Sequence, residues 1–232
     1  CWACGAACRC QLSTKWGTML AKTPKAHTMT TTIADDASHT PWLRRPGIVA
    51  LLAAALGSGL GLVASFVLSL ETLHLAQHPG GALNCDVNAV LSCSTVAQHW
   101  SAMVFGFPNS FVGMMTVPVM ITVVVALLAR ARLPRWFVRS AWGGAVLGMI
   151  FALWMFYMSF AVIRVLCPWC LTLDVGMLLI FFGMTRYCIE VGVIGGEHTK
   201  RFARHGYDVL CGVSVLVLAV ALIIVKFGAE LL

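Results

Sequence analysis

Charge is the property that this sequence has least of. Only 11% of its 232 residues are charged, while 59% are hydrophobic. A soluble domain carries about 25% charged and about 45–50% apolar residues, so this chain has too few charges to cover a surface that faces water. The shortage excludes a soluble enzyme, a disordered chain and an ordinary nucleic-acid-binding protein. We therefore expect a protein of the lipid bilayer with no nucleic-acid partner, despite a net charge of +7.

Charged residues are nearly absent from several long stretches of the chain. A membrane-spanning helix needs about 20 mostly apolar residues. Five stretches meet this requirement with at most one charge each, namely 47–70, 108–129, 140–163, 165–185 and 209–225. None alternates polar and apolar residues as the strands of a membrane barrel do. The sequence predicts an all-α integral membrane protein with five transmembrane helices.

Lysine and arginine are missing from one side of these spans. Segment 71–107 has neither, whereas fourteen of the sixteen lie before the first span, between the second and third, or between the fourth and fifth. Cytoplasmic loops are rich in these residues. We therefore expect a multi-pass protein of the inner or plasma membrane. Its N-terminus should be cytoplasmic, and segment 71–107 should lie on the outer side.

The same pattern divides the chain into three parts. Residues 1–46 are predicted to be a disordered cytoplasmic arm, residues 47–192 hold the first four spans, and residues 193–232 form a cytoplasmic loop and the fifth transmembrane helix. The arm carries Cys1, Cys4, Cys8 and Cys10. No zinc-finger spacing follows them and the cytoplasm is reducing, so we expect no metal site.

Four cysteines fall on the outer side, where disulfides form and persist. Cys85 and Cys93 lie in the outer loop, and Cys167 and Cys170 form a Cys-Pro-Trp-Cys motif at the outer end of the fourth span. Two pairs on one side of a membrane favour a redox function. The alternative is two structural disulfides that hold the loops.

The Cys-Pro-Trp-Cys motif is placed for reactivity. Cys167 is predicted near the N-cap of the fourth span, and Pro168 suits the first helical position. Cys170 then lies in the first turn, where free backbone N–H groups and the helix dipole favour a thiolate. Because the motif begins a membrane helix, a hydrophobic electron carrier in the lipid could reach Cys170.

The loop pair is expected to behave differently. Residues 85–93 have the pattern of an amphipathic helix lying over the mouth of the bundle. Joining Cys85 to Cys93 would require local unwinding, since the Cα atoms of a disulfide lie within about 7 Å of each other. Such a pair can act as a shuttle that exchanges with Cys167.

Three motifs together resemble a known family. They are Cys85-Asp86-Val87 with Ser92-Cys93-Ser94 and Val96, Asn109-Ser110-Phe111-Val112-Gly113 at the start of the second span, and the Cys-x-x-Cys at the start of the fourth. Over roughly residues 47–190 the chain is similar to the integral-membrane vitamin K epoxide reductases and their bacterial disulfide-forming homologues.

The resemblance implies a four-helix transmembrane bundle around a quinone, with the fifth helix added to it. Cys167 and Cys170 would be the active-site pair, with Cys170 facing the quinone. Cys93 would exchange with Cys167, and Cys85 would meet the protein partner. The resemblance also implies that Asn109 hydrogen-bonds a quinone carbonyl and that Asp86 anchors the loop.

Other residues depart from the family pattern or allow two interpretations. His99 replaces a serine or threonine, and Asp174 stands where vertebrate members have tyrosine, a difference that bears on epoxide chemistry. Asp174 is either a proton donor to the quinone or a neutral, hydrogen-bonded structural carboxyl. Asn109 could instead cap its helix. Trp169 is either a wall of the quinone site or an interfacial anchor.

We therefore expect a membrane thiol:quinone oxidoreductase that drives disulfide formation. Its partner would be a separate DsbA-like thioredoxin-fold protein on the outer side, and its acceptor menaquinone or ubiquinone. One alternative is a vitamin K epoxide or quinone reductase. The other is a non-enzymatic membrane protein held by its disulfides.

Overall fold

The computed structural model describes residues 47–78, 83, 85–86, 90–196, 198–199 and 206–231. What we expected of residues 1–46 lies outside the described residues. Five helices of the described part are long and apolar enough to cross a membrane. They are α1 (Ile48–Gln77), α3 (Asn109–Leu128), α4 (Arg135–Tyr157), α5 (Pro168–Glu190) and α7 (Tyr207–Leu231). The predicted all-α membrane fold is confirmed.

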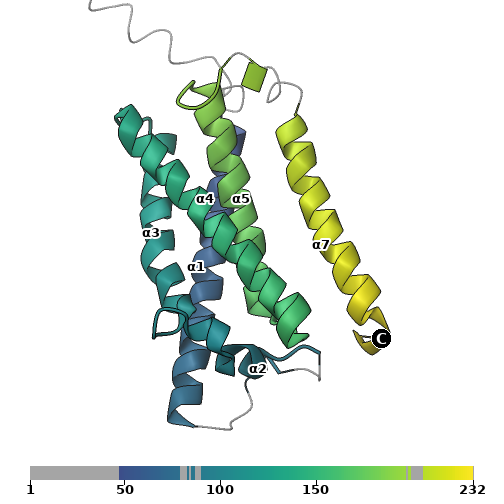
Figure 1. Ribbon diagram of the computed structural model, residues 1–232. Coiled ribbons are helices and arrows are strands. Elements are labelled where there is room, and N and C mark those ends of the chain that lie inside the picture. Colours follow the sequence, from purple (N-terminus) through teal and green to yellow (C-terminus); the bar gives the residue numbers. More distant parts are fainter. Residues whose placement is uncertain are drawn as a thin grey trace, which may run out of the picture. The chain divides into compact units, whose positions relative to one another are not determined.

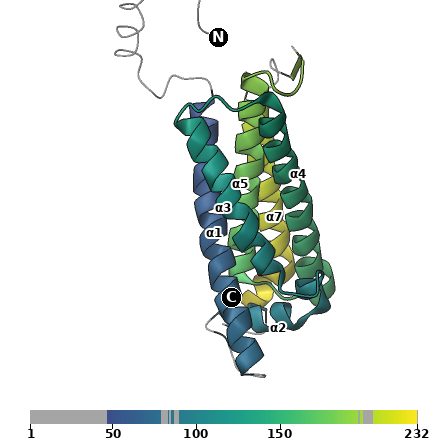
Figure 2. The ribbon, with the colours of Figure 1, turned by 90° about the vertical axis from the view of Figure 1, so that its left-hand side faces the viewer.

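Helices α1, α3, α4 and α5 form a bundle, and α7 runs along its outside (Figures 1 and 2). Helix α1 packs against α3 and α5, and α4 packs against α5. Glycines allow the closest contact: a Cβ atom added to Gly57 would lie 2.5 Å from the carbonyl oxygen of Gly176. Small residues at helix contacts are how membrane helices gain packing without a hydrophobic driving force.

Helix α1 is longer than its apolar run predicts. It was expected to end at Leu70 but continues to Gln77, so part of the expected outer loop is helical. Its last turn is stabilised by burial of Leu75 against the cysteine loop, and one turn earlier Thr72 donates a hydrogen bond back to the Leu68 carbonyl at 2.7 Å. The extension gives that loop a wall to pack on.

The outer loop contains less helix than we predicted around its cysteines. Helix α2 (Cys93–Gln98) begins only at Cys93, with Ser92 as its N-cap, and Cys85 and Asp86 are not helical. The predicted helix over 85–93 is therefore wrong. The physical reason is the disulfide, because Cα atoms eight residues apart on a helix cannot approach to the 5.7 Å seen between Cys85 and Cys93.

Helix α4 leads directly to the start of α5. It continues into a π-helical turn (Met158–Ile163) and stops at Arg164, which has a left-handed φ of 60°. Helix α5 then begins at Pro168, with Cys167 as its N-cap. The predicted N-cap and first helical residue are both confirmed. Residues 165–167, which we had included in the span, are extended instead.

Candidate active site

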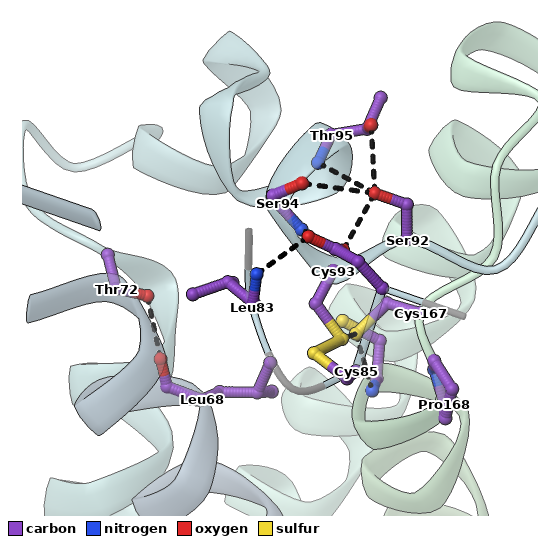
Figure 3. The surroundings of a disulfide bond; sticks show 12 residues. Leu68, Thr72, Leu83, Cys85, Ser92, Cys93, Ser94, Thr95, Cys167 and Pro168 are labelled. Carbon is purple, nitrogen blue, oxygen red and sulfur yellow. Dashed lines mark hydrogen bonds between the residues drawn. A yellow bond between two sulfur atoms is a disulfide. The ribbon is translucent and has the colours of Figure 1, made fainter. Parts of the chain in front are cut away.

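Asp86 anchors the loop that carries the cysteine pair. Its carboxylate accepts hydrogen bonds from the Leu83 amide at 2.9 Å, the Ser94 amide at 3.1 Å and the Ser92 hydroxyl at 2.8 Å. Figure 3 shows the Ser92, Ser94 and Thr95 side chains gathered at this point. Burial opposes ionisation of the carboxyl group, but these hydrogen bonds outweigh it and lower the pKa of Asp86 to about 2. The loop is therefore held by a carboxylate that stays ionised at physiological pH.

A short backbone pairing joins this loop to the start of α5. Leu91 and Leu166 form a parallel bridge. The Ser92 amide donates to the Leu166 carbonyl at 3.1 Å, and the Leu166 amide donates to the Val90 carbonyl at 2.8 Å. Cys93 and Cys167 follow the bridge directly, so the pairing brings two distant cysteine motifs to the same point.

The cysteines meet in one buried group. Cys85 and Cys93 form a disulfide, while Cys167 and Cys170 are free thiols. The Sγ atom of Cys167 lies 3.1 Å from the Sγ atom of Cys93 (Figure 3). Both residues are almost completely buried, at 2% exposure for Cys93 and 1% for Cys167. A thiol in contact with a disulfide sulfur has the proximity that thiol–disulfide exchange requires.

The surroundings of Cys167 favour its thiolate. Its Sγ atom accepts a hydrogen bond from the Cys170 amide at 3.4 Å. Hydrogen bonding from the Cys170 thiol is the main cause that lowers the pKa of Cys167, and the Cys170 and Trp169 amides add to it; burial and the Asp86 carboxylate oppose the shift. Cys167 is therefore both the helix cap and a thiol whose ionisation its neighbours favour.

A cavity of about 90 Å³ lies beside these sulfurs. Its walls come from α1, α3, α4, α5 and the outer loop, and they include Cys167, Cys170 and Asp174. The cavity shares Asn109, Phe151 and Leu173 with a larger apolar groove of about 680 Å³ lined mostly by α3, α4 and α5. A partly open space with few polar groups, next to an apolar groove, suits a ring with polar substituents and an apolar tail.

A quinone in this cavity would need hydrogen-bond donors for its carbonyl oxygens, and two polar side chains of α3 are placed to supply them. Ser110 lines the cavity, and its hydroxyl group is buried with no hydrogen-bond partner among the described residues. The Asn109 amide nitrogen also faces the cavity region: it donates to the Ser101 carbonyl at 2.7 Å and contacts the Met155 sulfur at 3.7 Å. A free hydroxyl and an amide N–H opposite a sulfur are donors that fit the carbonyl oxygens of a quinone.

Asn109 does not cap its helix. Pro108 is the N-cap of α3 and no side chain caps it. Asn109 instead holds the end of the outer loop, because its Oδ1 atom also accepts from the Val104 amide at 3.3 Å. The alternative we gave for Asn109 is therefore wrong. Asn109 lines the cavity, and its contact with a quinone stays a prediction.

Asp174 and Trp169, the other two residues predicted for the quinone site, lie in different surroundings. Asp174 lines the cavity one turn beyond Cys170, and within the described residues its carboxyl group has no hydrogen bond. Trp169 is not a cavity-lining residue; it packs against the cluster of Leu75, Cys85 and Cys93. At the second position of α5 it lies about 100° around the helix from Cys170, so it faces the loop.

A free thiol in contact with a disulfide, beside an apolar cavity and inside a bundle of membrane helices, is an arrangement typical of a membrane oxidoreductase. A family model described as the vitamin K epoxide reductase family matches residues 52–185, more than half of the chain. The chain belongs to the vitamin K epoxide reductase family. Members are membrane oxidoreductases of thiols and quinones, and the chain is an oxidoreductase of this kind. No curated protein matches the sequence.

Proposed function

We propose that the protein oxidises a thioredoxin-fold partner and passes the electrons, through its two cysteine pairs, to a membrane quinone. One observation carries this proposal: the Sγ atoms of Cys167 and Cys93 are 3.1 Å apart, and Cys93 is already in a disulfide with Cys85. Two structural disulfides would have no reason to hold a buried free thiol against a disulfide sulfur.

The outer pair receives the electrons. A thiolate of the DsbA-like partner attacks Cys85, and the second partner thiol then closes the disulfide of the partner, leaving Cys85 and Cys93 as thiols. Cys93 next attacks Cys167 of an oxidised Cys167–Cys170 pair, and Cys170 leaves as a thiolate. Cys85 finally attacks Cys93, which restores the Cys85–Cys93 bond and frees Cys167. The observed state, an oxidised outer pair beside a reduced inner pair, is the product of this transfer.

The inner pair delivers the electrons to the cavity. Cys170 lines it, so that closing the Cys167–Cys170 disulfide releases two electrons and two protons at its wall. A quinone, menaquinone or ubiquinone, supplies the two-electron acceptor there. Asn109 and Ser110 orient its oxygens by hydrogen bonds, and Asp174 holds a proton close to them. The Asp174 carboxyl group is the only charge within residues 165–185, which favours a functional role over a structural one.

The distribution of lysine and arginine supports the orientation that this pathway needs. It favours a cytoplasmic N-terminus and a cysteine loop on the outer side of the cell membrane, where we expect the partner. In this arrangement residues 47–192 are the redox core, and residues 193–232 add a cytoplasmic loop and the fifth transmembrane helix.

Anaerobic quinone reduction by the purified protein in detergent, with dithiothreitol as electron donor, tests the proposal. The native chain should reduce menaquinone or ubiquinone, and Cys170→Ala should abolish the reaction. Cys85→Ser should lose oxidation of a thioredoxin-fold partner but keep reduction by dithiothreitol, because a small dithiol reaches the inner pair directly. Failure of the native chain with all quinones offered, or activity with vitamin K epoxide alone, would overturn the proposal.

A further inference from the structure

Helix α7 contacts the remainder of the protein at two points. Among its described side chains, only Gly212 and Phe227 are buried. Near Gly212 the helix packs on α5, since a Cβ atom added there would lie 3.2 Å from the Phe182 ring. Phe227, at the other end of the helix, is only 4% exposed. Helices α1, α3, α4 and α5 pack against one another without α7, so the packing of the bundle does not explain why Phe227 is buried.

Phe227 covers the backbone bridge of the active site. It forms one buried cluster with Val90 and Leu166, against which Leu91 and Ile223 also pack. Val90 and Leu166 are joined by the 2.8 Å hydrogen bond that brings Cys93 to Cys167. An aromatic ring over this pair keeps water away from a bond that water would otherwise compete for.

Lys226 fixes the same end of α7 to the end of α4. Its ammonium group donates a hydrogen bond to the Phe160 carbonyl and lies 4.2 Å from the centre of the Phe160 ring. Phe160 belongs to the π-helical turn that closes α4, and it meets the Phe227 ring edge-on at 5.9 Å. A cation near the carbonyls at a helix C-terminus is stabilising. The turn leads within a few residues to Leu166 and Cys167.

We propose that Lys226 and Phe227 are positioning residues, a clamp that holds Cys93 and Cys167 in register for exchange. The inference rests on the proposed function. It gives the fifth helix a part in electron transfer: the clamp presses Val90 and Leu166 together, and these residues set the approach of the two sulfurs. Removing the clamp leaves the bundle and the quinone cavity intact, because neither Lys226 nor Phe227 lines the cavity.

The exchange can be followed by itself in a Cys170→Ser chain. There the Cys167 thiolate attacks Cys93, the Cys93–Cys167 bond forms, and the Cys85–Cys93 bond breaks. Cys85 leaves as a thiolate, so these three cysteines hold one disulfide and one thiol both before and after the exchange. A maleimide added at the end of each time point then caps the thiol that is present. Mass spectrometry of the Cys93–Cys167 linked peptides gives the rate.

Phe227→Ala should slow this exchange about tenfold or more, since small misplacements of reacting atoms have effects of this size. Phe227→Leu should restore much of the rate. Val225→Ala is the matched control, because Val225 is 86% exposed on the same turn, and it should not change the rate. In the chain that retains Cys170, Phe227→Ala should leave dithiothreitol-driven quinone reduction unchanged.

Two results would overturn the clamp. One is an unchanged exchange rate in Phe227→Ala. The other is an equal loss of exchange and of quinone reduction, which would show general damage to the fold. Absence of exchange in the parent Cys170→Ser chain would instead overturn the proposed function, and the clamp with it.

Discussion

Replacing Asp86 by asparagine should loosen the cysteine loop without unfolding the bundle. The Oδ1 atom of Asp86 accepts from Ser92 and Ser94, and the Oδ2 atom accepts from Leu83. An asparagine that keeps the first two bonds presents an NH₂ group to the Leu83 amide, so that one acceptor is lost and two donors face each other. The remaining two bonds also lose their charge.

The magnitude follows from the pKa of Asp86. A shift from 3.8 to about 2 corresponds to about 2.4 kcal/mol of preference for the ionised form in the folded loop. Solvent around the loop screens part of this, which leaves about 1–2 kcal/mol. The loop should therefore open about 5 to 30 times more often in Asp86→Asn than in the native protein.

Hydrogen–deuterium exchange measures this opening directly. Amides of residues 90–98 should exchange about 5 to 30 times faster in Asp86→Asn, while amides in the middle of α1 and α5 should not change. Asp174→Asn is the matched control, because it removes an acid that makes no contact with the loop. Unchanged exchange at residues 90–98 would show that the carboxylate does not hold the loop and would refute the reasoning.

Four further results are expected. Lowering the pH from about 4 to 2 should make the Cys85–Cys93 disulfide easier to reduce with a phosphine. The Asp86 carboxylate stabilises the folded loop fully above its unfolded pKa of 3.8, and this stabilisation is lost as the pH falls through its folded pKa of about 2. Asp86→Asn should lack this transition. Alkylation of Cys167 in a Cys170→Ala chain should be compared with that of the native reduced pair. The native profile should reach its plateau at lower pH, because the Cys170 thiol is the main group that lowers the pKa of Cys167 and alanine has no donor to replace it. Identical profiles would contradict this. Asp174→Asn should slow quinone reduction about 10²-fold or more if the acid donates a proton, and unchanged turnover and pH profile would exclude that role. Gly57→Val should prevent α1 and α5 from packing, because even a Cβ atom at this position would lie 2.5 Å from a backbone oxygen. Thermal stability in detergent measures the loss. Gly59→Val is the control, because a Cβ atom at Gly59 would meet open space.

Much of the fold could be predicted from the sequence because membrane spans follow from local composition. The five apolar runs correspond to the five long helices, and the Cys-Pro-Trp-Cys motif by itself predicted Cys167 as the N-cap and Pro168 as the first residue of α5. These features depend on neighbours within a few residues. The extension of α1 to Gln77 could not be predicted, because it depends on burial of Leu75 against a loop that is distant in sequence.

The site was harder to predict where it depends on contacts between distant segments. The four cysteines were expected to communicate, but no local pattern shows the bridge between Leu91 and Leu166, which uses backbone atoms only. Phe227 looked like one more apolar residue of a membrane helix. Ser110 was noted only as part of a motif, and its unpaired hydroxyl group becomes visible only in the folded structure. Trp169 was placed at the cavity from its position in the motif, whereas helical geometry turns it toward the loop.

The N-cap of α5 is itself a redox-active atom, and this links helix stability to the catalytic cycle. A thiolate at Cys167 is a strong acceptor for the Cys170 amide, whereas the same sulfur in a disulfide is a weak one. The first turn of α5 should thus fray slightly whenever Cys167 is bonded to another cysteine and tighten when it is released. The first turn of α5 would then loosen and tighten once in each turnover, at the membrane surface. A redox-dependent change in the resonance frequency of the Cys170 amide would detect this.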